Sequence, residues 1–600
     1  MENFIEKNGV SVRAFKGDAM TLLAFDLKEE LRANLAGFTI KYGLKNDTKQ
    51  NYMYNRLSFP DSVIIASNIP ETEKNSTLYA PIQKFNWVHV PNTNINTQNA
   101  IFGDYIYQIT PRYITNGQLD ILQTNLTVSI PINVSPFNLN NTKIGFTRGF
   151  VSSVAYAKRF NVNNNKVRPN EHDLLFNINL KADDAQRWNN VKKVMETTSY
   201  TFEEQHKWLG WQARERILEF LDEVINDNSL QIKVFAYDLN EPEICKRLLM
   251  LASQGRLQII LDDDGKHAEK LGMEGQFETQ FLQKATGNSK LIRGHYNGLA
   301  HCKVFILLNK SNVALKVLTG STNFSTNGVY INSNHVLVFD NKNIAERYNN
   351  LFDNSFSEQK LKTLKGKEPT ILDYEFNEIG MPKMTVTFAP HLKTDAKRIF
   401  DRISSRIEKK DTTNVLFAIM NDSSESSILK SIRTQLKNPA VFTYGITDKI
   451  NKNASDYQVF LYKPNNSNGI EVAARGIQNV LPKPFGTIAK IDGYAIHHKF
   501  VVVNFRGKDP VVYAGSSNLA FNPEQKNGDN LLEIHDKDVV TAFAIEALRL
   551  VDHFHWRNFE LDATKTMNLD DLSNLNKSWY KAWFNPNDLK NKQRLLYINA

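Results

Sequence analysis

A long internal duplication constrains the fold of this chain more than any other feature of its sequence. Two segments, which begin at His301 and at His497, each carry a His-x-Lys unit followed by a Gly-Ser-x-Asn unit. The two His-x-Lys units lie 196 positions apart and the two Gly-Ser pairs lie 195 apart, so the copies are in register. Because this period is too long for a solenoid, the repeat predicts two similar domains related by a pseudo-twofold axis.

Segments with helical periodicity alternate with short apolar segments around both copies. In the first copy, helical segments at 202–225 and 241–253 alternate with strand-like segments at 231–237 and 256–261. The same order returns between residues 394 and 444. This alternation predicts an α/β fold, with two halves in which mixed sheets are flanked by helices.

Residues 1–160 follow a different pattern, in which short alternating apolar runs lie between Asn, Pro and Gly clusters. Short strands at this spacing predict an N-terminal all-β sandwich, similar to an immunoglobulin or fibronectin module. One of the predicted strands is 61–66, and the one long helical candidate is 152–160. Since no motif in this part carries chemistry, we expect a module that binds a protein partner or covers the site.

The predicted organisation has four parts. A β domain spans residues 1–160, a linker with an entry helix near 182–196 spans 161–200, and the two α/β halves span 201–385 and 386–600. No run of about 18 apolar residues is present, so no helix is expected to span a membrane. The polar N-terminus lacks the apolar stretch of a secretory signal, which favours a cytoplasmic location.

Charge and cysteine content narrow the classes of function. The chain has 73 basic and 64 acidic residues and a net charge of +9, which suits a polyanionic or membrane-surface substrate. Its two cysteines, Cys245 and Cys302, exclude a four-cysteine zinc site and argue against a disulfide framework. The run Asp262–Asp264 follows a predicted strand, and we expect a solvated turn there rather than a metal site.

The polar residues of the two copies are expected to meet at one end of each sheet. Along a strand, residues i and i+2 point to the same face, so His301 faces with Lys303 and His497 with Lys499. A turn and a second strand then bring the Gly-Ser-x-Asn unit back beside the start of the histidine strand. Ligands of α/β folds tend to bind at such strand ends.

These groups fit the chemistry of a phosphodiester. Lysine binds phosphate as a point charge, and Asn and Ser supply neutral donors to phosphoryl oxygens on which charge develops. One histidine can attack phosphorus while the other protonates the leaving oxygen. An imidazole that titrates near pH ~6.5 can do either at neutral pH. The scheme needs no metal ion and no other cofactor.

The paired motifs resemble the phospholipase D superfamily, whose signature combines His-x-Lys-x4-Asp with a downstream Gly-Ser-x-Asn. The resemblance covers roughly residues 200–560 and implies two α/β halves that share one site, with a covalent phosphohistidine intermediate. By position it implies that His301 is the nucleophile and His497 the general acid. It further implies a set of phosphate-binding and lining residues, namely Lys303, Lys499, Asn323, Asn518, Ser321 and Ser516.

Both copies depart from this signature where an Asp is expected. Leu308 and Asn504 occupy the two positions. Some members of the superfamily, including tyrosyl-DNA phosphodiesterases, also lack this Asp, so its absence does not exclude activity. Glu533, downstream of the second motif, is a candidate partner for a histidine ring nitrogen. The first half has no acid at the matching offset, which leaves His301 without a carboxylate partner, or paired with Asn334 or a distant residue.

Three functions are compatible with these residues. A metal-independent phosphodiesterase that acts on nucleic acid is favoured by the basic charge, and its affinity would fall with salt through counterion release. The alternative is a phospholipase D or phosphatidyltransferase that acts on glycerophospholipids, which exposed apolar loops around the pocket would favour. The third is an inactive binding module, which a pocket blocked by bulky side chains would favour.

Overall fold

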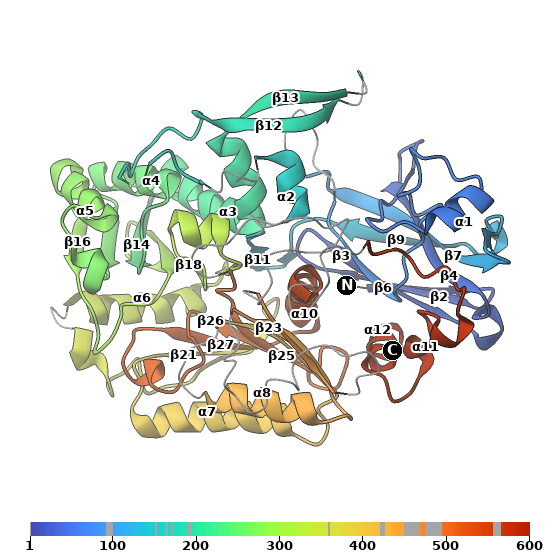
Figure 1. The fold of residues 1–600 in the computed structure, drawn as a ribbon. Coiled ribbons are helices and arrows are strands. Elements are labelled where there is room, and N and C mark those ends of the chain that lie inside the picture. Colours follow the sequence, from blue (N-terminus) through green and yellow to red (C-terminus); the bar gives the residue numbers. More distant parts are fainter. Residues whose placement is uncertain are drawn as a thin grey trace.

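The computed structural model describes residues 2–599 with the exception of 92–99, 150–152, 162–165, 171, 190, 191, 193, 358–360, 421–425, 449–467, 475–494 and 556–565. Two large sheets with their helices form one side of the molecule, and an all-β unit forms the other side (Figure 1). Among the described residues, no helix combines the length and the apolar character that crossing a membrane requires.

Within the described residues, the two large sheets have eight strands each and the same topology. The first has the order β10 (Asn138–Leu139), β11 (Thr142–Phe146), β19 (His335–Phe339), β18 (Ala314–Gly320), β17 (Val304–Asn309), β14 (Leu230–Ala236), β15 (Leu257–Leu261), β16 (Lys290–Arg293). The second has the order β20 (Tyr374–Phe376), β21 (Lys383–Phe388), β27 (Asn530–His535), β26 (Val511–Gly515), β25 (Lys499–Val503), β22 (Asn414–Ile419), β23 (Phe442–Thr447), β24 (Ile470–Ala473). In both sheets the strand directions also agree, since β14 runs parallel to β15 and antiparallel to β17, as β22 does to β23 and β25. The predicted α/β duplication is confirmed.

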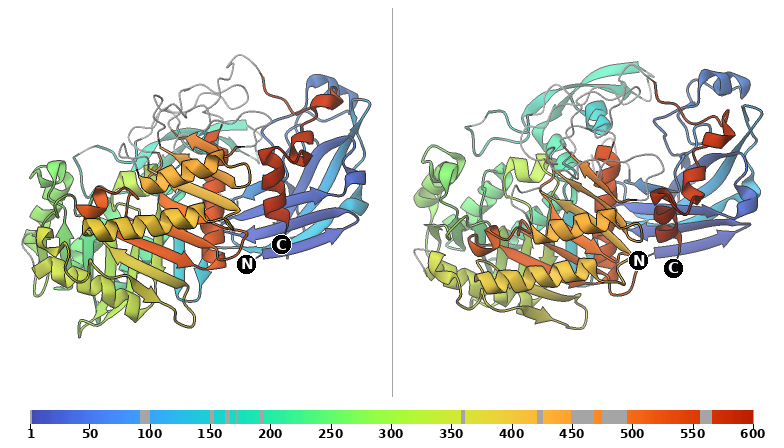
Figure 2. Two further views of the ribbon diagram at one scale, coloured as in Figure 1. Left: turned by 90° about the horizontal axis from the view of Figure 1, so that it is seen from below. Right: turned by 60° about the horizontal axis from the view of Figure 1, so that its bottom comes forward.

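Helices and sheets stack in five layers. The outer helices of the first half are α3 (Phe202–Asn226), α4 (Pro242–Ser253) and α5 (Met273–Lys284), and those of the second are α7 (Lys393–Glu408) and α8 (Ser427–Lys437). Between the sheets lie α6 (Lys342–Ser357) and α10 (Lys537–Phe554), which share one apolar core with the inner faces of both sheets. The outer helices bury the opposite sheet faces in separate cores, and Figure 2 shows α7 and α8 lying across the second sheet.

The N-terminal strands form an all-β sandwich, as predicted. One sheet has the order β1 (Glu2–Lys7), β2 (Val10–Lys16), β3 (Thr21–Leu27), β6 (Asn86–His89). The other contains β5 (Asn51–Tyr52), β4 (Leu35–Leu44), β7 (Gly103–Thr115) and β8 (Gln118–Leu119), with β9 (Val128–Val134) also paired to β7. Buried and exposed residues alternate along β9, the pattern of a strand with one face in the core.

Segments far apart in the sequence complete these units. Strands β10 and β11, from the segment predicted as the β domain, pair with the first α/β sheet through β19. The C-terminal helices α11 (Lys581–Phe584) and α12 (Leu589–Ile598) return to the sandwich, where Trp583 joins its core (Figure 1). The division of the chain into the four predicted parts stays a proposal.

Two secondary-structure predictions are wrong. Residues 61–66, predicted as a strand, form the short helix α1 (Asp61–Ala66) after Pro60, whose fixed φ suits a helix start, and only Val63 is buried. The predicted entry helix near 182–196 is instead a hairpin of β12 (Lys181–Asn189) and β13 (Val194–Thr201), in which the Thr- and Val-containing strand β13 pairs antiparallel with β12. The helix predicted at 152–160 is present as α2 (Val154–Arg159).

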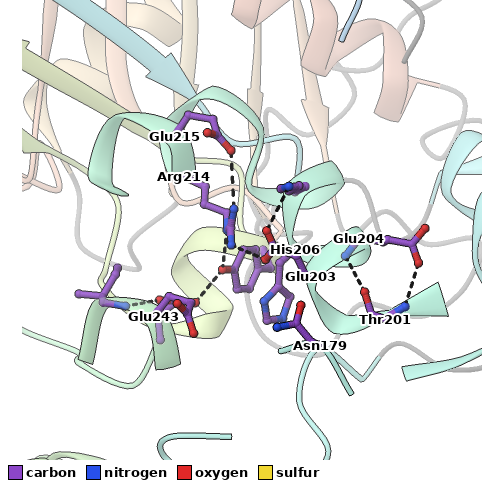
Figure 3. Close-up of polar contacts among 12 residues, drawn as sticks. Asn179, Thr201, Glu203, Glu204, His206, Arg214, Glu215 and Glu243 are labelled. Carbon is purple, nitrogen blue, oxygen red and sulfur yellow. Dashed lines mark hydrogen bonds and ion pairs between the residues drawn. The ribbon is translucent and has the colours of Figure 1, made fainter. Parts of the chain in front are cut away.

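Helix α3 begins where the hairpin ends. The Thr201 hydroxyl accepts the amide of Glu204, whose carboxylate accepts the amide of Thr201, and these two bonds form a capping box (Figure 3). Arg214, one of the residues around the kink at Trp211, donates to Glu203 at 2.6 Å. Short helices complete the fold: η1 (Glu29–Leu31), η2 (Thr124–Leu126), η3 (Gly265–Ala268), η4 (Asn327–Ile331), η5 (Leu361–Leu364), η6 (Pro523–Gln525) and η8 (Leu575–Lys577).

Candidate active site

The two His-x-Lys units lie at equivalent positions in the two sheets and meet between the halves. His301 and Lys303 lie within three residues before β17, and His497 lies two residues before Lys499, the first residue of β25. The halves are joined at this point by a parallel bridge between Ser333 and Ile496. Both histidines are almost fully buried, 3% and 7% exposed, and both lysines are buried.

Each histidine is held by a residue from the opposite half. Nδ1 of His301 lies 2.7 Å from Oδ1 of Asp529, and Nδ1 of His497 lies 2.9 Å from Oδ1 of Asn334. Asn334 and Asp529 are 195 positions apart, so they are the two copies of one position in the repeat. The site is therefore symmetric in shape but asymmetric in charge, since a carboxylate supports one ring and a neutral amide supports the other.

The two motif serines orient these partners. Ser321 donates its hydroxyl to Oδ1 of Asn334 at 2.8 Å, and Ser516 donates to Oδ1 of Asp529 at 2.8 Å. Each serine oxygen also accepts the backbone amide that follows its partner. Both side chains are fully buried, so in this structure they act on the residues behind the histidines.

Four basic side chains lie close enough in the site to affect one another's pKa, namely His301, Lys303, His497 and Lys499. Burial lowers the pKa of Lys303 to about 8, against the opposing effect of Asp529. Burial, and then the charge of Lys303, hold the pKa of Lys499 well below its usual range. The pKa of His497 lies well below its usual range because of burial and then of both lysines. Mutual repulsion of this kind is relieved by an anion, which makes the site a natural position for a phosphate group.

The motif asparagines differ in their surroundings. Asn323 is buried and donates Nδ2 to Asp238 at 2.6 Å, whereas Asn518 is half-buried. The Oδ1 atoms of both asparagines have no hydrogen-bond partner within the described ranges.

The structure contradicts the predicted role of Glu533. Its carboxylate lies 3.1 Å from Nε2 of His535 and 3.1 Å from Nε of Arg402 on α7, on the outer side of the second sheet. The acid that supports a site histidine is Asp529, which directly precedes β27. Sequence reasoning missed it, although the 195-residue offset applied to Asn334 leads to Asp529.

Two further buried acids anchor the loops in front of the histidine strands. Asp262 accepts the amide of Ala300 at 2.6 Å, and Asp448 accepts the amide of Ala495 at 2.6 Å. The prediction of a solvated turn is therefore wrong at Asp262, whose side chain is fully buried. Its hydrogen bond to Ala300 holds the loop directly before His301.

A cluster of possible metal ligands lies beside the first-half site. The ligand atoms of Asp238, His267 and Glu274 all lie within 4.8 Å of one another. Both ring nitrogens of His267 already face carboxylates, Asp262 at 2.8 Å and Asp238 at 2.7 Å. Burial alone would lower the pKa of His267, but these carboxylates raise it to about 10. The arrangement is that of an imidazolium between two acids.

Residues 221–356 match a family model described as "Cardiolipin synthase, PLD-like domain". The matched region contains the first His-x-Lys and Gly-Ser-x-Asn units, so this part of the chain is similar to a phospholipase D-like domain. No curated protein sequence matches the chain.

Several solved structures resemble the chain at low sequence identity. Polyphosphate kinase from Porphyromonas gingivalis is 15% identical over 54% of this chain, with a TM-score of 0.37. The match spans 46% of the kinase, which is less than half of its length. Phosphatidylserine synthase from Haemophilus influenzae is 12% identical over 65% of this chain and 94% of its own, with a TM-score of 0.38. The phospholipase D family member Nuc from Salmonella typhimurium is 20% identical over 24% of this chain and 88% of its own, with a TM-score of 0.20.

Proposed function

We propose that this chain is a phosphodiesterase of the phospholipase D type, which cleaves a phosphodiester through a covalent phosphohistidine on His301. The observation that carries the proposal is the unequal support of the two histidines, by the carboxylate of Asp529 for His301 and by the amide of Asn334 for His497. The enzyme class follows from the superfamily, and the order of the two histidines follows from this asymmetry.

In the first step, Nε2 of His301 attacks phosphorus while the bond from phosphorus to the leaving oxygen breaks. The new P–N bond places positive charge on the imidazole, which the carboxylate of Asp529 at 2.7 Å stabilises through Nδ1. Burial lowers the pKa of His301, so its ring is neutral and carries a lone pair before attack. Nδ1 of His497 faces the neutral amide of Asn334, so this ring suits the other role, in which it exchanges a proton.

His497 gives a proton to the leaving oxygen in the first step and takes one from water in the second. Burial, and then the charges of Lys499 and Lys303, hold down the pKa of His497 in the free protein, and the negative charge of a bound phosphodiester offsets the part due to the lysines. Substrate binding therefore allows His497 to be protonated when it is needed. Attack of water on phosphorus then breaks the P–N bond and returns His301 to its free state.

The remaining motif residues bind the phosphoryl oxygens. Both lysine ammonium groups already donate to the carbonyl of the neighbouring histidine, which fixes them at the floor of the site. Each keeps further N–H donors for a phosphate. In this scheme the positive charge of the site comes from protein side chains, and no step requires a metal ion.

Nucleic acid is the favoured substrate class, because the net charge of +9 suits a polyanion. Glycerophospholipid is the alternative class, and a contest between DNA, RNA and phospholipid vesicles separates the two. Binding of a protein partner by the β sandwich, and the cytoplasmic location, stay predictions.

Hydrolysis of bis(p-nitrophenyl) phosphate in EDTA tests the proposal. Steady turnover should persist in EDTA for the wild type and be lost in both His301→Ala and His497→Ala. His89→Gln is a matched control, since His89 is a buried histidine in the β sandwich. Turnover that needs a metal ion, or that survives either alanine substitution, would contradict the proposed mechanism.

A further inference from the structure

A buried line of hydrogen bonds runs from Asn334 away from the site, through the core between the two sheets. Ser321 contacts the ring of His335 (Oγ to Nδ1, 3.1 Å), and His335 contacts His498 (Nδ1 to Nδ1, 3.1 Å). The two rings are stacked, with centroids 5.4 Å apart and an interplanar angle of 4°. The line ends at Glu546 on α10, 3.2 Å from Nε2 of His498, and we call these four residues beyond Asn334 the relay.

The charge at the far end of the relay is fixed. Arg549 donates to both carboxylate oxygens of Glu546, at 2.6 and 2.7 Å. Burial alone would raise the pKa of Glu546, but the charge of Arg549 and the hydrogen bonds of Arg549 and His498 lower it. Glu546 is thus an anion and an obligatory acceptor, so the hydrogen on Nε2 of His498 points toward it.

The hydrogen on Nε2 of His498 in turn determines which nitrogen of His335 carries a hydrogen. Burial lowers the pKa of both His498 and His335, and that of His335 lies well below its usual range. Both rings are therefore neutral. Since His498 carries its hydrogen on Nε2, its Nδ1 is an acceptor, and the facing Nδ1 of His335 must be the donor. Nε2 of His335 is buried and finds no partner in the part of the chain that the structure describes. With the hydrogen on Nδ1, this nitrogen carries a lone pair, and an unpaired lone pair costs less than an unpaired N–H group.

The hydrogen on Nδ1 of His335 determines the orientation of the hydrogen bonds at Ser321 and Asn334, next to His497. Nδ1 of His335 carries one hydrogen, which His498 and the Ser321 oxygen share, so this nitrogen cannot accept from Ser321 and the Ser321 hydrogen points to Oδ1 of Asn334. Nδ2 of Asn334 donates to the carbonyl of Gly328 at 2.9 Å, which fixes the same orientation of the amide. Oδ1 of Asn334 therefore faces Nδ1 of His497 as an acceptor, and the lone pair of neutral His497 lies on Nε2.

The corresponding positions behind His301 hold no titratable pair of this kind. The repeat places Cys302 opposite His498 and Asn530 opposite His335, and Asn530 donates to the Cys302 sulfur at 3.9 Å. There the partner of the catalytic ring is itself an acid, Asp529, which accepts without help. On the His497 side, the amide of Asn334 supports the ring, and the acid Glu546 lies at the far end of the relay.

We propose that His335, His498 and Glu546 are positioning residues for His497, which hold its Nδ1 as the donor and so keep the lone pair of the ring on Nε2, the atom that accepts a proton from water. The proposal rests on the proposed function, in which His497 is the base of the second step. Its consequence is a defect confined to hydrolysis of the phosphohistidine, since attack by His301 does not involve the relay.

Bis(p-nitrophenyl) phosphate separates the two steps. Its leaving group departs as a stable anion, so the initial burst of p-nitrophenolate reports attack by His301, and the steady rate reports hydrolysis. The chain supplies conservative replacements through its own symmetry, namely His335→Asn and His498→Cys, alone and combined. Glu546→Gln is a second kind of variant that keeps the size of the side chain and removes its charge.

We expect each variant to keep the burst rate within about twofold and to lose about tenfold or more in steady rate, because general base catalysis contributes about 10²–10⁴-fold. The proposal would be overturned if the burst rate and the steady rate fell equally in every folded variant, or if neither rate fell. Thermal melts identify variants that fail to fold, and His89→Gln should change neither rate. Absence of any burst in the wild type would instead count against the proposed function itself.

Discussion

The imidazole of His301 and the carboxylate of Asp529 lie 2.7 Å apart, although 228 positions separate them in the chain. They come from different halves of the duplicated fold, and the reciprocal pair, His497 with Asn334, has an amide in place of the acid. The duplication thus gives a symmetric frame in which one substituted position distinguishes the two histidines. The predictions below follow from that difference and from the buried lysines.

Asp529→Asn makes the two pairs chemically alike and should slow the burst of p-nitrophenolate. We expect a decrease of about 10- to 100-fold, because a hydrogen bond to a charged group contributes about 1.5–3 kcal/mol. The measurement is stopped-flow kinetics with bis(p-nitrophenyl) phosphate. Glu533→Gln is the matched control, since it removes an acid from the same region of the chain on the outer side of the sheet. An unchanged burst in Asp529→Asn would show that the carboxylate does not assist attack.

Lys499→Met should stabilise the protein while it abolishes turnover. The folded-state pKa of Lys499 lies well below its value in the unfolded chain, so the buried ammonium destabilises the fold at neutral pH. Stability of the wild type should therefore rise as the pH increases toward about 10.4, the ordinary lysine value. The gain in melting temperature from Lys499→Met should be largest near pH 7 and should shrink as the pH rises. A variant less stable than the wild type at pH 7 would contradict this account of the site.

Inorganic phosphate should raise the melting temperature of the wild type near pH 7, because an anion offsets the repulsion between Lys303 and Lys499. The pKa of Lys303 is about 8, so the shift should diminish above that pH as the ammonium loses its proton. Lys303→Met should lose most of the shift. The exposed Lys397, which pairs with Asp401 on α7, supplies the control variant Lys397→Met. An equal shift in both variants would indicate phosphate binding elsewhere.

The fold and the motif residues could be predicted because the duplication repeats both a pattern of elements and a set of side chains in register. Motif spacing placed His301, Lys303, His497 and Lys499 at strand starts, and the structure brings them together. The partners of the histidines could not be read from one copy alone. Each ring is held by the other half, whereas the sequence analysis looked for an acid at a matching offset in the same half, which led to Glu533 and passed over Asp529.

The errors in secondary structure have a local origin. The hairpin of β12 and β13 contains charged residues at spacings that also suit a helix, and its stability comes from pairing across the ladder, which periodicity does not report. Strands β10 and β11 lie in sequence beside the sandwich but complete the first α/β sheet through β19. Their place depends on the duplicated topology, in which β20 and β21 take the same position in the second sheet.

Trapping of the covalent intermediate tests the assignment of the two histidines most directly. His497→Ala should react once with bis(p-nitrophenyl) phosphate and then stop, because no base remains to activate water. Mass spectrometry of its peptides should then find a p-nitrophenyl phosphoryl group on His301, while His301→Ala should carry no such group. A modified His497 in the His301→Ala protein, or no modification of His301 in the His497→Ala protein after a burst, would contradict the mechanism.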